Sequence, residues 1–194
     1  MRLFVVVRHG ESQRNVERRV SGNPDVPVAL TAKGEAEARA LAEQIRHVPF
    51  DVCFHTRFER TRRTAELALA GRGVLTVEEP LFDDIRVGEL DGHTLEEYRT
   101  WKRAHTSADA FPGGESLNDA ARRYAEGYRT LLAREEERIL LVTHEIPVRW
   151  ALNCVAGSNE LDAPIHDVRN ATPYLFDEES LTSASDRLER LAAG

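Results

Sequence analysis

The sequence LFVVVRHGES, residues 3–12, joins five apolar residues to a polar segment that begins with Arg8 and His9. An unbroken short apolar run predicts a strand that is covered on both faces, as in a mostly parallel sheet. The sequence ILLVTH, residues 139–144, has the same form and ends in His144. Ligands of open parallel sheets bind beyond the carboxyl ends of the strands. We therefore expect His9 and His144 to face one site from two strands.

The rest of the chain alternates between short apolar runs and amphipathic segments. Residues 52–54 and 74–77 predict two more strands covered on both faces. Helices are predicted from the cap Thr31 to about residue 48, over about 58–70, from the cap Ser116 to the charged run 134–138, and from Pro147 to Gly157. This alternation predicts an α/β fold, a three-layer sandwich with a mostly parallel central sheet flanked by helices. We expect one domain over residues 1–194, in which residues 180–194 form either a terminal helix or a flexible tail.

The composition excludes several classes of protein. The 194 residues carry 26 Lys and Arg against 33 Asp and Glu, a net charge of −7, which argues against a general nucleic-acid binder. Cys53 and Cys154 lie in separate apolar runs and predict buried thiols rather than a disulfide or a zinc site. The apolar run at residues 3–7 is too short for a signal peptide or a membrane span. We expect a cytoplasmic protein with no membrane partner.

The pairing of Arg8 with His9 predicts phosphate chemistry. A permanent guanidinium charge opposes a metal cation, whereas its planar donors match phosphate oxygens. Gly10 lets the backbone come close to a ligand. A neutral imidazole can attack phosphorus and carry the phosphoryl group covalently. These residues favour a phosphate pocket with a histidine nucleophile.

The motif RHGES, residues 8–12, resembles the signature of the histidine phosphatase superfamily, the phosphoglycerate mutase-like proteins. Further elements similar to those of the family follow in the family's order over about residues 2–157: Asn15, Ser21-Gly22, LTAKGEA (30–36), TRFERTRRTA (56–65), FPGGES (111–116) and LVTH (141–144). The resemblance implies the phosphoglycerate mutase-like fold. It also implies a phosphoryl-transfer enzyme that needs no cofactor and no metal.

The resemblance assigns a role to each matching residue. His9 is the nucleophile that forms a phosphohistidine, and Arg8, Arg60 and His144 complete a cationic cage around the transferring phosphoryl group. Such a cage acts by positioning and by stabilising charge. The resemblance also implies neutral donors at the rim of the site, namely Asn15, Ser21 and Gly22.

The family's proton donor is a carboxylate four residues before a glycine. In the matching stretch FDDIRVGELDG, residues 82–92, this position is Asp84, one methylene shorter than the family's usual glutamate. Asp83 is the second candidate and Glu89 a weaker third. A general acid beside His9 should have a raised pKa. The alternative is an aspartate pair in a solvated turn.

Four other features bear on specificity. Glu145 follows His144 where the family usually has glycine, and HTR, residues 55–57, replaces the common S-S-P. Glu145 and Arg57 either select part of the substrate or pair with each other. The arginines after the nucleophile either meet a second anionic group or lie on a solvated surface; they are Arg14, Arg18 and Arg19. Residues 101–111 form either a lid or plain helix and turn.

The sequence thus favours a cofactor-independent phosphomonoesterase that acts on a small phosphorylated metabolite. The first alternative is a phosphoglycerate mutase, whose relatives tend to carry a longer insertion than the 144 − 84 = 60 residues that separate Asp84 from His144 here. A non-catalytic phosphate-binding protein is the second alternative. The third is a metallohydrolase with His9, His144 and Asp84 as ligands, which Arg8 and Arg60 disfavour electrostatically. The substrate, and whether the protein is a monomer or a dimer, stay open.

Overall fold

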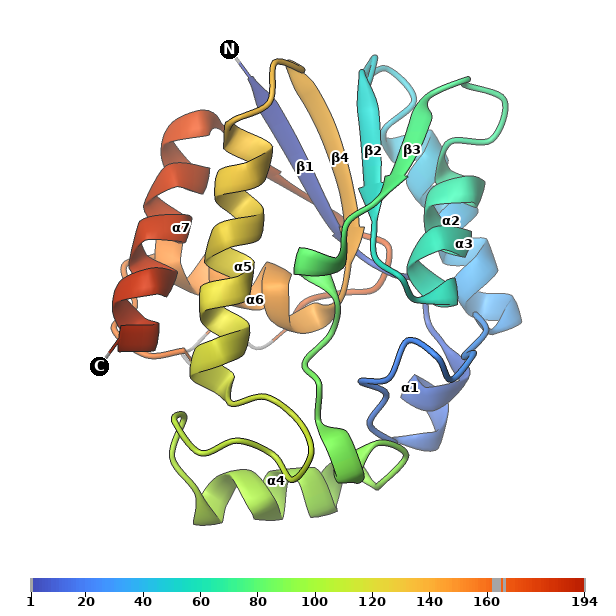
Figure 1. Cartoon of the computed structure of the whole chain (residues 1–194). Helices are drawn as coiled ribbons and strands as arrows, with labels where there is room; N and C mark the ends of the chain where they lie inside the picture. Colours follow the sequence, from blue (N-terminus) through green and yellow to red (C-terminus); the bar gives the residue numbers. More distant parts are fainter. Residues whose placement is uncertain (1, 162–164, 166, 194) are drawn as a thin grey trace.

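A computed structural model describes residues 2–161, 165 and 167–193 (Figure 1). Within this part of the chain, one sheet has the strand order β3-β2-β4-β1-β5. Its strands are β1 (Leu3–Arg8), β2 (Val52–His55), β3 (Leu75–Glu78), β4 (Arg138–Thr143) and β5 (Pro173–Phe176). The first four strands are mutually parallel, and β5 pairs with β1 in the antiparallel direction. The predicted mostly parallel α/β sheet is confirmed, while the antiparallel strand β5 was not predicted.

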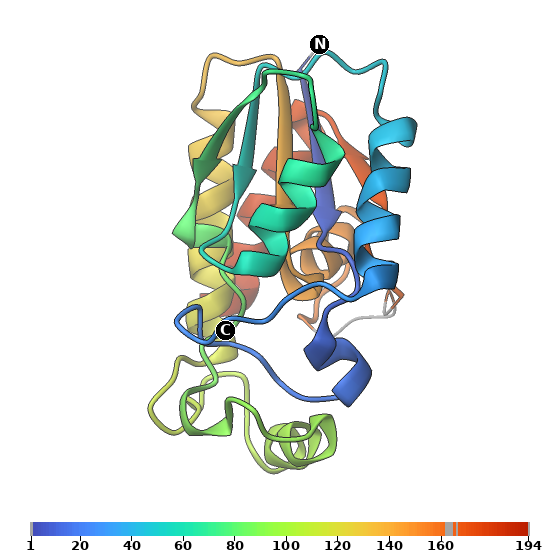
Figure 2. The same cartoon turned by 90° about the vertical axis from the view of Figure 1, so that its right-hand side faces the viewer.

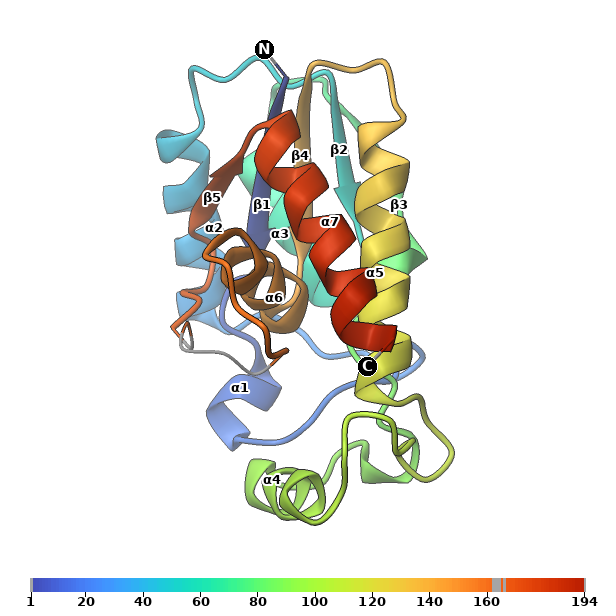
Figure 3. The ribbon, with the colours of Figure 1, turned by 90° about the vertical axis from the view of Figure 1, so that its left-hand side faces the viewer.

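Helices cover both faces of the sheet, which makes three layers (Figures 2 and 3). One face carries α2 (Ala32–Gln44) and α3 (Glu59–Ala68), and the other carries α5 (Leu117–Leu132), α6 (Glu145–Val155) and α7 (Glu178–Ala193). Alternate residues of β1 serve the two cores: Phe4 and Val6 pack with α5 to α7, whereas Val5 and Val7 pack with α2 and α3. This double burial explains why the strand has no polar alternation.

The predicted helix caps are present. The Thr31 hydroxyl accepts a hydrogen bond from the Gly34 amide at the start of α2, and Ser116 forms a reciprocal capping box with Asp119 at the start of α5. Helix α6 begins at Glu145, two residues before the predicted start at Pro147. A proline in the first turn removes no helical hydrogen bond, so the helix extends to the end of β4.

The strand at one edge of the sheet departs from the prediction, and the C-terminal segment adopts one of its two predicted forms. Strand β3 is not covered on both faces as predicted: it is the edge strand of the sheet, and Leu75 is 66% exposed. Residues 178–193 form helix α7, so the helical alternative describes residues 180–193. Leu181 and Leu188 bury this helix against α5 and α6.

Both cysteines are buried, as predicted. No helix in the described part of the chain is long and apolar enough to cross a membrane.

The carboxyl ends of β1, β2 and β4 point to one edge of the sheet, and two further helices lie beyond that edge (Figure 1). They are α1 (Gln13–Glu17) and α4 (Leu95–Ala104). The segment 101–111 comprises the last turn of α4 and a turn that ends at buried Phe111, over which Trp101 packs at 4.2 Å between ring centroids. These elements leave a cavity between the sheet edge and α4.

Candidate active site

A cavity of about 760 Å³ lies at this edge of the sheet. Most of the predicted site residues line it: Arg8, His9, Asn15, Ser21, Gly22, Arg60 and Asp84. His144 lies directly behind the wall, with no exposed surface, and its ring centroid is 5.4 Å from that of His9. The fold therefore brings together side chains from four separate segments of the chain.

His9 is held with one ring nitrogen toward the protein and the other toward the cavity. Its Nδ1 lies 2.7 Å from the Gly10 carbonyl oxygen, an acceptor, so the ring proton belongs on Nδ1. The Arg60 Nε donates to His9 Nε2 at 3.1 Å, which requires a lone pair on that atom. Burial, and then the charges of Arg60 and Arg8, hold the pKa of His9 well below its usual value. His9 is thus a neutral imidazole whose Nε2 lone pair accepts from Arg60 at the cavity.

Arg60 is the hub of the site. It lies on α3 with 3% of its surface exposed, and its guanidinium stacks over the Phe58 ring at 4.3 Å. Besides His9, the guanidinium donates to the hydroxyl and carbonyl oxygens of Ser21, to Asp84 Oδ2 at 3.3 Å and to His144 Nδ1 at 3.1 Å. One buried cation therefore fixes the relative positions of the other groups.

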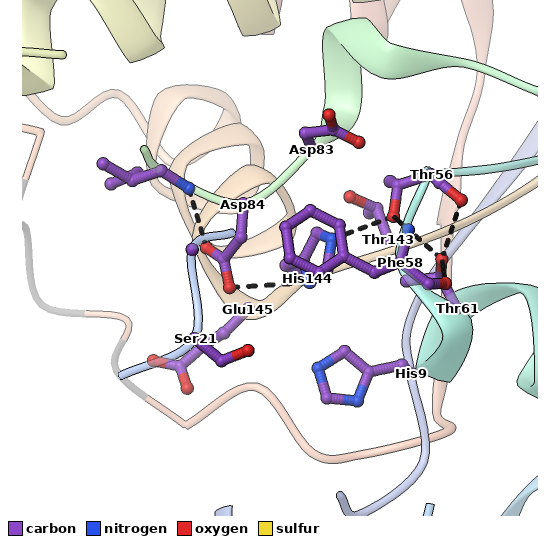
Figure 4. Close-up of polar contacts among 12 residues, drawn as sticks. His9, Ser21, Thr56, Phe58, Thr61, Asp83, Asp84, Thr143, His144 and Glu145 are labelled. Atoms are coloured by element: carbon purple, nitrogen blue, oxygen red, sulfur yellow. Dashed lines mark hydrogen bonds and ion pairs between the residues drawn. The ribbon is translucent and has the colours of Figure 1, made fainter. Parts of the chain in front are cut away.

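The two adjacent aspartates point in different directions (Figure 4). Asp84 Oδ2 lies 3.5 Å from His144 Nδ1, and burial raises the pKa of this carboxyl, with Glu145 adding and Arg60 opposing. Asp83 is 2% exposed and faces away, where it accepts from the backbone amide and guanidinium of Arg57 at 2.6–3.1 Å. Only Asp84 of this pair lines the cavity.

Glu145 lies beside the phosphate-site arginine predicted at position 8. Its carboxylate pairs with Arg8 at 3.1 Å and with Arg149 at 3.2 Å. Arg57 pairs with Asp83 instead. The alternative in which Glu145 and Arg57 pair with each other is therefore wrong, because α6 directs Glu145 into the cavity while Arg57 turns toward the segment that follows β3.

The predicted rim donors differ in what they can offer a ligand. Ser21 accepts from Arg60 through its hydroxyl. The Gly22 amide already donates to Asp91 Oδ1 at 2.7 Å. The side-chain oxygen of Asn15 accepts from the amide and hydroxyl of Ser12, which caps α1. All three residues line the cavity, but the Gly22 donor is occupied.

Close backbone packing fixes the loop that carries His9. A Cβ on Gly10 would meet the Gly34 carbonyl oxygen at 2.4 Å, so α2 abuts the loop directly. The Gly10 amide donates to the Thr64 hydroxyl at 3.0 Å, and the Asn170 side chain donates to the His9 carbonyl at 2.7 Å. Sequence reasoning missed Asn170, which lies far along the chain with no motif around it.

The cavity wall is strongly cationic. Among the described residues that line it, eight carry a positive charge and two a negative charge. Of the three arginines after the nucleophile, Arg14 and Arg19 line the cavity and Arg18 does not. Helix α4 adds basic side chains that the sequence did not single out, namely Arg99, Lys102 and Arg103. The acidic whole-chain charge conceals this pocket.

The arrangement does not suit a divalent cation. Arg60 donates to His9 Nε2, to His144 Nδ1 and to Asp84, so the atoms that would ligate a metal already face a guanidinium. In the described part of the chain, no group of three or more His, Cys, Asp or Glu side chains is placed to hold a metal ion. The hydrogen-bond donors of the cavity match a phosphate dianion rather than a metal cation.

Comparison with known proteins agrees with this geometry. The family model of the histidine phosphatase superfamily (branch 1) matches residues 4–187. The chain is 37% identical over 167 residues to the 2,3-bisphosphoglycerate-dependent phosphoglycerate mutase 2 of Gloeobacter violaceus, which covers 78% of this chain and 74% of the relative. Among solved structures, YhfR of Bacillus stearothermophilus superposes with a TM-score of 0.78 at 23% identity, covering 90% of each chain. The alpha-ribazole phosphatase of Shigella flexneri superposes with a TM-score of 0.70 at 25% identity, covering 80% of each chain.

Proposed function

The chain belongs to the histidine phosphatase superfamily, and from this premise we propose that it is a phosphomonoesterase that works through a phosphohistidine on His9. The observation that carries the proposal is the state of His9: a buried, neutral imidazole whose Nε2 lone pair faces a cationic cavity. The proposed substrate is a small phosphorylated metabolite. No cofactor or metal takes part in the proposed chemistry.

In the first step, His9 Nε2 attacks phosphorus and the bond from phosphorus to the ester oxygen breaks. The leaving oxygen takes its proton from Asp84, the carboxyl whose pKa is raised by burial. In the second step, water attacks the phosphohistidine and gives a proton to the Asp84 carboxylate. Orthophosphate leaves, and His9 and Asp84 return to their starting states.

Arg8 and Arg60 stabilise the charge on the phosphoryl oxygens during both steps, and His144 joins them when its Nδ1 is protonated. Arg60 is already fixed by Ser21, so the cage needs little rearrangement when a phosphate enters. Arg8 also has a buried Nε without a hydrogen-bond partner among the described residues. A phosphate oxygen would satisfy this donor.

Phosphoglycerate mutase activity is the second candidate, favoured by the mutase named among the relatives. A mutase must hold a bisphosphate and keep water from the phosphohistidine. Here the cover over the cavity is α4, and none of its residues is fully buried. We infer that a cover with no fully buried residue lets water reach the phosphohistidine, which favours hydrolysis.

The test is rapid-quench trapping of a phosphoenzyme with a radiolabelled phosphomonoester. We expect acid-labile, base-stable label on the wild type and none on His9→Asn, in which the amide can still donate to the Gly10 carbonyl. His47→Asn, on an exposed surface outside the cavity, is the matched control and should label normally. Full labelling of His9→Asn would exclude this nucleophile.

Product analysis separates the two candidates. A phosphatase releases orthophosphate from a panel of phosphorylated metabolites in excess EDTA. A mutase interconverts 2- and 3-phosphoglycerate without orthophosphate release, and that result would overturn the hydrolase proposal. Loss of turnover in EDTA that zinc or magnesium restores would favour a metallohydrolase.

A further inference from the structure

Two buried hydroxyls, those of Thr56 and Thr61, lie in a row beside His144 (Figure 4), and neither threonine is among the residues that line the cavity. His144 Nε2 lies 3.0 Å from the Thr56 hydroxyl, and the Thr56 hydroxyl lies 2.8 Å from that of Thr61. The Thr61 hydroxyl donates to the Phe58 carbonyl oxygen at 2.8 Å. Both threonines have no exposed surface. The proposed phosphatase mechanism gives neither threonine a role in binding or catalysis.

The donors and acceptors of this row can be assigned in only one direction. A guanidinium can only donate, so the bond from Arg60 to His144 Nδ1 requires a lone pair on that nitrogen. The single proton of the neutral ring is then on Nε2, and Nε2 donates to Thr56. The Thr56 hydroxyl in turn donates to Thr61, whose proton goes to a backbone carbonyl oxygen, with Phe58 at 2.8 Å nearer than Thr56 at 3.2 Å. Each hydroxyl donates once, and no buried proton is left without an acceptor.

We propose that Thr56 and Thr61 are positioning residues that hold His144 in its Nε2-protonated form and present Nδ1 to the reacting phosphate. His9 is held in the opposite form, with its proton on Nδ1 and its lone pair on Nε2. Two histidines at neighbouring strand ends thus serve different chemistry because their backing groups differ. A carbonyl oxygen backs His9, and a hydroxyl relay backs His144.

The relay determines where His144 can gain a proton. Nε2 keeps its proton in both charge states because Thr56 accepts it, so a second proton can enter only at Nδ1. That atom lies 3.5 Å from Asp84 Oδ2 and beside Arg60. A proton released there would stay between Asp84 and the phosphoryl oxygens. The path of this proton rests on the proposed function. The position of the single proton on each neutral histidine does not.

The pattern is tested by long-range proton–nitrogen correlation NMR on protein labelled with ¹⁵N at histidine. The His144 signals are identified by their loss in His144→Asn. We expect the wild type to show His144 protonated at Nε2 and His9 protonated at Nδ1. A wild-type spectrum with His144 protonated at Nδ1 would overturn the proposal, whatever the activity of the protein.

Variants test the relay itself. Thr56→Val has nearly the shape of threonine but no hydroxyl, so it should change the His144 pattern and lower kcat about 10- to 100-fold, the scale on which a histidine's orienting partner acts. Thr56→Ser should restore both. Thr61→Val should have a smaller effect in the same direction, and Thr61→Ser should restore it.

Ser185→Ala is the matched control, because this buried hydroxyl donates to the Ala125 carbonyl between α7 and α5, away from the cavity. It should leave both the spectrum and kcat unchanged. Two outcomes would overturn the proposal: Thr56→Val with wild-type kcat and spectrum, or Thr56→Ser as impaired as Thr56→Val. If Thr56→Val does not fold, the wild-type spectrum and the Thr61 pair still decide the question.

Discussion

Replacing Asp84 with asparagine tests the proposed proton donor most directly. The substitution keeps the size of the side chain and an oxygen that can accept from the Ile85 amide, but it removes the carboxyl that gives and takes the proton. Asp83→Asn is the matched control, one residue away and turned out of the cavity. The two variants should therefore behave differently.

For Asp84→Asn, the expected loss depends on the leaving group. General acid catalysis typically contributes about 10²- to 10⁴-fold, so kcat for an alkyl phosphate should fall by that factor, about 3–5 kcal/mol of barrier. p-Nitrophenolate leaves without protonation, and kcat for its ester should fall less than about tenfold. When Asp84 is ionised, its carboxylate 3.3 Å from Arg60 gives an attraction of about 5 kcal/mol before desolvation is subtracted, and the variant lacks this attraction. The freed guanidinium should bind orthophosphate more tightly.

For Asp83→Asn, the expected effect is on stability. Asp83 is buried and paired with Arg57, and loss of this charged partner should lower the free energy of unfolding by about 1–3 kcal/mol. The assay is kcat for a series of alkyl and aryl phosphates, with urea unfolding of each variant. A leaving-group-dependent loss in Asp83→Asn, with Asp84→Asn unaffected, would place the proton donor one residue earlier.

Three further predictions concern His9, Glu145 and Gly10. His9 is buried and neutral with a depressed pKa, so the unfolded chain binds a proton below about pH 6.5 that the folded chain does not. Protonation of His9 in the unfolded chain therefore lowers the free energy of unfolding as the pH falls below that value, by up to about 1.4 kcal/mol between pH 7.5 and 5.5. His9→Asn should reduce the pH dependence of urea unfolding by this amount. Glu145→Gln removes the competitor for Arg8, so the inhibition constant of orthophosphate should fall about two- to fivefold at low salt; a weaker affinity would show that Glu145 orients Arg8 instead. Gly10→Ala places a Cβ against the Gly34 carbonyl, so thermal unfolding should occur at a lower temperature and turnover should be lost. Gly73 lies in open space at a φ of +65°, so Gly73→Ala should lower stability only and leave turnover intact.

Much of the fold could be predicted because the two cores impose a pattern on the sequence. Strands β1 and β4 are buried on both faces and therefore read as unbroken apolar runs. The caps Thr31 and Ser116 announce their helices locally. Strand β5 has no such signal, because an edge strand of four residues, PYLF, needs only one buried face. Helix α7 was ambiguous for a related reason: its stability comes from packing on α5 and α6 rather than from its own polar sequence.

The sequence by itself determined which residues could carry phosphoryl chemistry. The motifs around His9, Arg60 and His144 are local, and each lies at or just after the end of a predicted strand. Asp83 and Asp84 lie in the same motif, so the sequence could favour Asp84 over Asp83 only by the distance of Asp84 from Gly88. Which of the two enters the cavity depends on where Arg57, Arg60 and His144 lie in space.

Only the tertiary structure decided the states of these groups. The protonated nitrogen of each histidine follows from its partner: the Gly10 carbonyl behind His9, and Arg60 with the Thr56 hydroxyl on either side of His144. The pKa shifts follow from burial, which no local motif encodes. These contacts join residues up to 88 positions apart along the chain. Hydrogen bonds and desolvation depend on distances of a few ångströms, and folding alone sets those distances.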